Sequence, residues 1–184
     1  MLLNLQSFLR RGARPIARFR RAQHGATAVE FAIIAPFFLG TLVALLETAI
    51  YLFAQQTLQV AAIEASRQLM TGAAQNSSMT QAQFIQSVCP LVQPLFNCNK
   101  LMVDVQSSAS FVGANASAPT LTYNAQGQVT NSWVYNPGTA GQVIVVRLIY
   151  QWSVVGGPLG FSLSNLPGNM AEMVGVSAFR VEPY

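Results

Sequence analysis

The chain has 184 residues and a formal net charge of +4, and this charge is unevenly distributed. The first 25 residues hold six of the ten basic residues and no acidic residue, so the remainder has four basic and six acidic residues, a net charge of −2. The only histidine, His24, lies in this basic segment, which excludes a histidine-activated nucleophile elsewhere in the chain. With no glycine-rich phosphate loop either, we expect no catalytic site, no cofactor and no enzymatic activity.

A long apolar stretch follows the basic segment. From Ala26 to Phe53 the only charged residues are Glu30 and Glu47. A helix needs roughly 20 mainly apolar residues to cross a bilayer core of about 30 Å. A buried helix of a soluble protein would carry a polar stripe at helical period, and residues 31–46 have none. The stretch therefore predicts a membrane-spanning helix.

The charges on either side of this helix predict its orientation. Six arginines precede it, whereas Glu47, Glu64 and a single Arg67 follow it. Because basic flanks stay on the cytoplasmic side, we expect a cytoplasmic N-terminus and an extracytoplasmic C-terminal part, and the basic cluster gives no support for nucleic-acid binding. The alternative is a secretory signal peptide, but the apolar run is longer than a signal core of about 7–15 residues.

The helix is expected to continue past the membrane. No proline or glycine lies between Glu47 and Met70, and Gly72 then supplies a stop signal. We predict a helix over residues 26–71, roughly 70 Å long at 1.5 Å per residue. Its second half is expected to have one apolar face, made of Leu52, Leu58, Ala62, Ala65 and Leu69.

Residues 72–184 are expected to form an extracytoplasmic head. We predict a short helix over residues 81–88, before Pro90, and strands over residues 101–106, 142–155 and 173–181, of which the second is rich in β-branched residues. A hairpin over residues 121–135 would turn at Asn124–Gly127. The predicted fold class is α+β: a long N-terminal helix against which a small antiparallel sheet of three to five strands packs.

The two cysteines of the head, Cys89 and Cys98, are separated by eight residues. In an extracytoplasmic compartment such a pair usually forms a disulfide, and closing this loop would contribute about 2.5–3 kcal/mol in the chain-entropy model. The alternative is a metal or redox site. Because no second cysteine pair and no histidine lies nearby, we predict the disulfide and no metal site.

A second motif surrounds the start of the apolar helix, where Gly25 and Ala26 are followed by Glu30 and Pro36. In these residues the chain resembles pilin-like precursors, and more closely the TadE-like proteins of tight-adherence (Flp) pilus systems. The matching residues are 20–32, Pro36, 54–59, 62 and 65–67. The resemblance implies that a prepilin peptidase cuts the bond between Gly25 and Ala26 on the cytoplasmic face. Residues 1–25 would then be a cleaved leader, and Glu30 would be the fifth residue of the mature chain.

Glu30 has a predicted role in recognition and assembly. A carboxylate in an apolar membrane helix costs about 2.5–3.5 kcal/mol at the bilayer centre and less near the interface, so it normally faces a partner. The resemblance implies pairing with the amine of Ala26 between packed subunits, while the alternative is that Glu30 reaches the lipid headgroups. Glu47, at the far edge of the apolar run, is explained by exposure at the interface.

Two functions remain open from the sequence. The first is a minor pilin-like structural subunit that acts in pilus assembly or anchoring. Its partners would be a prepilin peptidase, other pilin and pilin-like subunits and the inner-membrane assembly platform. The second is an uncleaved single-pass membrane protein whose head binds a ligand or partner. Both place the chain in a bacterial inner membrane with the head in the periplasm, and the first allows entry into an extracellular pilus.

Overall fold

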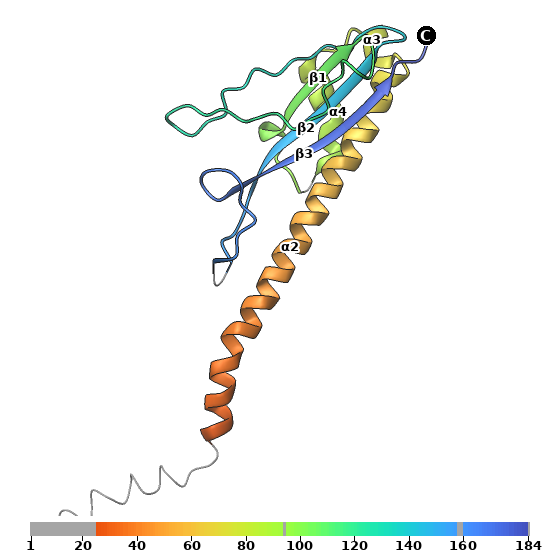
Figure 1. The fold of residues 1–184 in the computed structure, drawn as a ribbon. Helices are drawn as coiled ribbons and strands as arrows, with labels where there is room; N and C mark the ends of the chain where they lie inside the picture. Colours follow the sequence, from red (N-terminus) through yellow and green to blue (C-terminus); the bar gives the residue numbers. More distant parts are fainter. Residues whose placement is uncertain (1–24, 94, 158–159, 184) are drawn as a thin grey trace, which may run out of the picture. The chain divides into compact units, whose positions relative to one another are not determined.

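The computed structural model describes residues 25–93, 95–157 and 160–183, so the predicted leader, except Gly25, lies outside the described residues. The described elements are one long helix, α2, two shorter helices, a 3₁₀ turn and three strands (Figure 1). The chain divides into two compact units, residues 1–43 and 44–184. The predicted α+β class, a long N-terminal helix followed by a small antiparallel sheet, is confirmed.

Helix α2 spans Ala26–Met70, 45 residues, and continues through Pro36. It ends because Gly72 adopts a left-handed conformation, with φ of 75°, and donates its N–H to the carbonyl of Leu69. Because glycine has no Cβ, the left-handed conformation costs it little free energy. The predicted end at residue 71 is therefore confirmed to within one residue.

In the second unit, one face of α2 forms the base of the hydrophobic core. Leu58, Ala62, Ala65 and Leu69 are fully buried, as predicted. Leu52 is 60% exposed, so its assignment to this face was wrong. Leu52 lies six positions before Leu58, so at 3.6 residues per turn its side chain is rotated about 240° around the helix from that of Leu58. The next core residue toward the N-terminus is Ala54.

The sheet has three antiparallel strands in the order β1 (Met102–Ser108), β2 (Val143–Ser153) and β3 (Met170–Arg180). The predicted hairpin between residues 121 and 135 forms only its turn, with one isolated bridge between Tyr123 and Val129. Its residues are mostly exposed and polar, so a second strand pair would gain little burial. Most of this segment is irregular.

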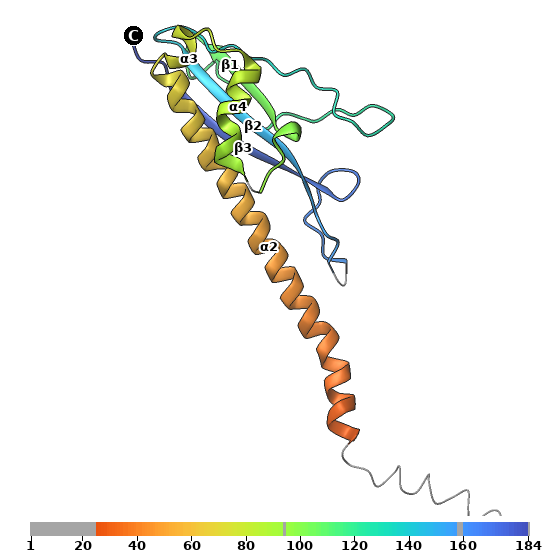
Figure 2. The same cartoon turned by 180° about the vertical axis from the view of Figure 1, so that it is seen from behind.

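Helix α4 (Gln81–Val92) covers the same face of the sheet as α2 (Figures 1 and 2). Its start is set by a capping box between Thr80 and Gln83. The helix was predicted to end at residue 88, before Pro90, and this was wrong: it continues through Pro90 to Val92. Proline there removes one hydrogen bond in the last turn, while burial of Val92 in the core holds that turn in place.

Two short elements complete the head, α3 (Ala73–Asn76) and the 3₁₀ turn η2 (Cys98–Lys100). Both outer strands of the sheet, β1 and β3, also form hydrogen bonds with residues outside the sheet. Beside β1, Val105 donates its N–H to the carbonyl of Val134 at 2.8 Å and accepts from the N–H of Asn136 at 2.9 Å. Beside β3, side chains of α2 bind the strand. An unpaired strand edge would be open to pairing with another chain, so these contacts limit aggregation.

Candidate processing and assembly site

Gly25 lies one residue before α2 begins at Ala26, and both are exposed. A Cβ placed on Gly25 would meet no atom within 4 Å, and its φ is not among the positive ones. Neither space nor backbone conformation within the described residues therefore requires glycine here. A functional demand, such as a peptidase that accepts only a small residue, would explain the glycine at this position.

Glu30 lies four residues after Ala26, one turn further along α2 and on the same side of the helix. The Glu30 side chain is exposed, and no described residue forms an ion pair with it. If the chain begins at Ala26, the new amine lies within one turn of this carboxylate, at the positive end of the helix. Gly25, Ala26 and Glu30 thus lie within the first turns of α2 or directly before it, and their role as one site stays a prediction.

The first unit presents an apolar surface on all sides of α2. Large side chains around the full circumference are exposed, among them Phe31, Ile34, Phe37 and Leu39. The best membrane-length window of this helix has a mean hydropathy of 2.2 and is only 6% buried. An apolar surface of this extent requires a lipid or protein partner. This one apolar helix is compatible with a single-pass membrane protein.

A second apolar stripe on α2 was not predicted. In the second unit, Leu46, Phe53 and Val60 follow one another at seven-residue steps, and all three are exposed. They lie opposite the buried Leu58 face, and exposed Ile63 extends the stripe by one turn. The heptad spacing was visible in the sequence as a signal for helix pairing. Within the second unit, one face of α2 is therefore buried in the core and the opposite apolar face is exposed.

Glutamine side chains hold the head onto α2, which sequence reasoning also missed. Gln59 donates from Nε2 to the carbonyl of Val176 at 2.8 Å and accepts the N–H of the same residue at 3.0 Å. Gln55 donates to the carbonyl of Val174 at 3.0 Å. Gly175, between these two partners, allows close approach, because a Cβ there would lie 2.5 Å from the carbonyl oxygen of Leu58.

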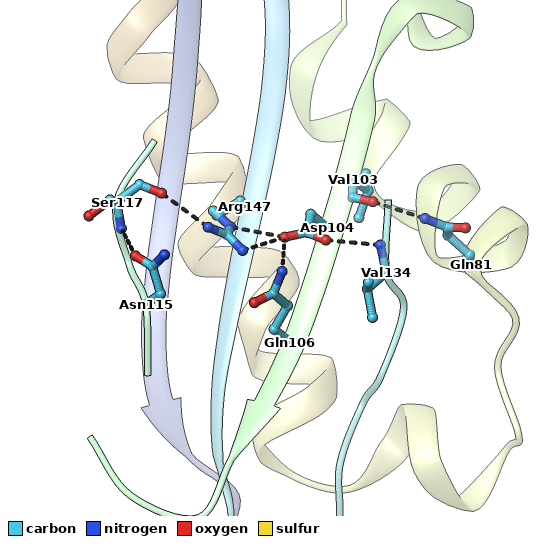
Figure 3. Close-up of polar contacts among 8 residues, drawn as sticks. All are labelled: Gln81, Val103, Asp104, Gln106, Asn115, Ser117, Val134 and Arg147. Carbon is cyan, nitrogen blue, oxygen red and sulfur yellow. Dashed lines mark hydrogen bonds and ion pairs between the residues drawn. The ribbon is translucent and has the colours of Figure 1, made fainter. Parts of the chain in front are cut away.

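An ion pair is buried in the head between Asp104 of β1 and Arg147 of β2 (Figure 3). The Asp104 Oδ2 atom lies 2.6 Å from Nη2 of Arg147 and 3.0 Å from its Nε. Oδ1 of Asp104 accepts the N–H of Val134, and Arg147 donates from Nη1 to the carbonyl of Ser117. The pair thus ties the long segment between β1 and β2 to the sheet. These contacts indicate a structural role.

Cys89 of α4 and Cys98 of η2 form a disulfide, with their Cα atoms 5.6 Å apart, as predicted. Gln93, Phe96, Asn97 and Asn99 line an open groove beside it. Among the described residues, no group of three or more His, Cys, Asp or Glu side chains is placed to hold a metal ion.

Three side chains of the second unit have buried carboxylate or hydroxyl oxygens without a hydrogen-bond partner among the described residues. Burial raises the pKa of Glu172 above its ordinary value, and its Oε1 has no hydrogen-bond partner in the described chain. Burial also raises the pKa of Tyr135, whose hydroxyl is equally unpaired. Both carboxylate oxygens of Glu47 are shielded from solvent without a partner, so the explanation of Glu47 by interfacial exposure was wrong.

Residues 25–67 match the family model described as TadE-like protein. Neither the comparison with curated proteins nor the comparison with solved structures gives a match. The matched segment begins at Gly25 and covers α2 as far as Arg67, so it includes Glu30, both apolar faces of the helix and the glutamines that hold β3. Over these residues the predicted resemblance to the TadE-like family is confirmed.

Proposed function

We propose that this protein is a minor pilin-like structural subunit of a tight-adherence pilus, processed by a prepilin peptidase between Gly25 and Ala26. The observation that carries the proposal is the TadE-like segment, residues 25–67, on a helix that is uncharged from residue 31 to 46 and exposes large apolar side chains there. Further support comes from Gly25, because no described neighbour requires a glycine there. Its role is assembly or anchoring, without enzymatic activity.

The proposal includes a topology. The leader and the scissile bond lie on the cytoplasmic side, α2 crosses the inner membrane, and the disulfide-bonded head lies in the periplasm. The six arginines before Ala26 support this orientation. The partners are the prepilin peptidase, other pilin-like subunits and the inner-membrane assembly platform. The stripe of Leu46, Phe53 and Val60 offers neighbouring subunits a surface that the head does not use.

The mature N-terminus tests this proposal. We expect the protein isolated from its host membranes to begin at Ala26, and the Gly25→Val variant to keep the full leader while still inserting with its head outside. The matched control is Gly12→Val, which changes a leader glycine away from the scissile bond and should be processed normally. N-terminal sequencing or intact-mass measurement gives the result. A wild-type chain that begins at Met1 would favour the uncleaved membrane-anchored binding protein instead.

A further inference from the structure

A groove lies on the face of the sheet that points away from α2 and α4. Alternate residues of β2, Arg147 and Gln151 among them, point to this face, because the residues between them lie in the core. The segment that joins β1 to β2 crosses it. Arg147 donates from Nη1 to the carbonyl of Ser117 at 3.1 Å (Figure 3), and Gln151 donates from Nε2 to the hydroxyl of Tyr123 at 3.0 Å. These two bonds fix the segment over β2 and make it one wall of the groove.

The groove consists of two adjoining hollows in the second unit, with volumes of about 450 and 500 Å³. They adjoin because Gly127, Gln151 and Met170 line both of them. Small-molecule sites usually have volumes of about 300–1,000 Å³. Each hollow is therefore large enough for a small ligand, and the two together form a site for an elongated one.

Each hollow is lined by one half-buried aromatic side chain, Tyr123 in the first and Trp133 in the second. Tyr123 is held by the hydrogen bond from Gln151. Trp133 is held by the next residue, Val134, whose N–H donates to the Asp104 carboxylate at 2.9 Å. Aromatic side chains supply a large contact area at little cost in conformational entropy. Because the face of an aromatic ring is electronegative, it attracts the weakly positive C–H groups that cover one face of many sugar rings.

The rest of the lining is rich in side-chain amides, which come from Asn99, Gln128 and Gln151. Each amide offers donors and an acceptor, and a sugar hydroxyl both donates and accepts, so the two groups are complementary. Lys100 is the one charged residue among the described residues that line the groove. A charged ligand that leaves water needs groups of opposite charge around it. The chemistry of the groove therefore favours an uncharged ligand with many hydroxyl groups.

An extended peptide is the alternative ligand for a groove with aromatic and amide groups. Such a peptide gains much of its affinity by adding a strand to an open sheet edge. The edge of β1 is already in use, because Val105 exchanges backbone hydrogen bonds with Val134 and Asn136. The carbonyl of Val103 accepts from Nε2 of Gln81 at 2.9 Å. Side chains rather than backbone groups thus supply the polar contacts at this end of the groove, which favours a sugar.

We propose that this groove binds a short, uncharged oligosaccharide. Its sugar rings stack on Tyr123 and Trp133, and its hydroxyl groups form hydrogen bonds with the amides of Gln128 and Gln151. This binding goes beyond the proposed function, because it gives the head a ligand of its own. It depends neither on peptidase cleavage nor on pilus assembly, so the cleaved and the uncleaved chain bind the sugar equally well.

The test is isothermal titration calorimetry of the full chain in a zwitterionic detergent, because a detergent with a sugar headgroup would compete for the groove. The probes are the uncharged trisaccharides maltotriose, cellotriose, mannotriose and the trimer of N-acetylglucosamine. Trp133→Ala removes a stacking ring, whereas Trp133→Phe keeps an aromatic face. The matched control is Phe111→Ala, because Phe111 is a 59% exposed aromatic residue of the same connecting segment and lies outside the lining of the groove.

We expect saturable binding of at least one trisaccharide, about tenfold weaker in Trp133→Ala, mostly retained in Trp133→Phe and unchanged in Phe111→Ala. If Trp133→Ala fails to fold, Asn99→Ala replaces it, since Asn99 is exposed and its loss should weaken binding without disturbing the core. Binding of none of the trisaccharides would overturn the proposal, and so would equal affinities of the wild type and Trp133→Ala.

An uncharged proline-rich peptide is titrated in parallel. Saturable binding of this peptide without binding of any trisaccharide would overturn the sugar site in favour of a peptide site. The mature N-terminus is measured separately, so a head that binds no sugar leaves the proposed pilin-like function standing, and an uncleaved chain that binds sugar refutes processing alone.

Discussion

Buried polar groups of the head fall into two kinds at the residue scale. Asp104 and Arg147 are buried but satisfy each other and two backbone groups of the neighbouring segments. Glu172 and Tyr135 keep an oxygen buried without a partner among the described residues. A buried group without a partner costs the free energy of removing it from water, whereas a satisfied pair recovers most of that cost. The two kinds should therefore respond to mutation in opposite directions.

For Glu172 the expected response depends on pH. Because burial raises its pKa above the ordinary value of 4.5, the folded state holds the proton more tightly than the unfolded state does. The free energy of unfolding then falls as pH rises through the unfolded and into the folded pKa. Glu172→Gln removes this penalty, so its melting temperature should exceed that of the wild type at pH 7, with a smaller difference at pH 4.

Thermal unfolding of the full chain in detergent, followed by tryptophan fluorescence, measures this difference. Glu182→Gln, at an exposed glutamate near the C-terminus, is the control for removing one negative charge. A Glu172→Gln variant that is less stable than wild type at pH 7 would contradict the prediction and would indicate a partner for the carboxylate.

Loss of the buried ion pair should be costly. Asp104→Asn keeps the shape of the side chain but leaves the buried Arg147 without a countercharge, so we expect a loss of about 3–5 kcal/mol in the free energy of unfolding. The control is Glu64→Gln, which breaks the exposed pair with Arg67 at 3.2 Å and should cost about 0–1 kcal/mol. Denaturant unfolding measures both, and equal losses would refute a structural role for the buried pair.

At the scale of elements, Gly175 allows α2 and β3 to approach each other closely. Gly175→Ala would place a Cβ 2.5 Å from the carbonyl oxygen of Leu58 and 2.8 Å from its carbonyl carbon. Because these are backbone atoms, the helix and the strand must separate, which also strains the hydrogen bonds from Gln55 and Gln59. Overpacking of this kind costs about 1–3 kcal/mol.

The control for this change is Gly156→Ala, because a Cβ there meets nothing within 4 Å and the φ of Gly156 is not among the positive ones. Denaturant unfolding of the full chain should show the loss for Gly175→Ala and almost none for Gly156→Ala. A Gly175→Ala variant as stable as the control would mean that the helix and the strand are not held in this register.

At the scale of the whole molecule, the effect of mutating Glu30 distinguishes a subunit that assembles with others from a protein that is only anchored in the membrane. A carboxylate at the start of an apolar helix costs free energy unless it finds a partner, so a simple anchor should tolerate Glu30→Gln. A subunit that docks on a neighbour's amine loses that contact. We expect Glu30→Gln cells to insert and cleave the protein normally but to produce few pili.

Piliation counted by electron microscopy, together with the mass of the membrane-bound chain, measures this outcome. Glu64→Gln is the control, because it removes an exposed carboxylate of the same helix within the second unit. The disulfide between Cys89 and Cys98 should form in every variant. Normal piliation in Glu30→Gln cells would favour the membrane-anchored binding protein.

The sequence by itself determined the features that depend on local pattern. The bounds of α2 were predicted from the apolar run, from Gly72 and from the absence of helix breakers after Glu47. Such features can be predicted because helix ends and membrane-length segments depend on residues that are adjacent in the sequence. The motif of Gly25, Ala26 and Glu30 predicted the resemblance to the TadE-like family over residues 25–67, while the processing site at these residues stays a prediction. The strongest strand, β2, was also predicted, since its β-branched run fits a buried sheet.

Only the tertiary structure decided which residues meet across the chain. It placed Leu52 outside the core, joined Asp104 to Arg147, and brought Gln55 and Gln59 to the edge of β3. It also replaced the predicted hairpin strands with an irregular segment and carried α4 past Pro90. These outcomes depend on packing between segments far apart in sequence, where burial outweighs local propensity, so no pattern of neighbouring residues contains them.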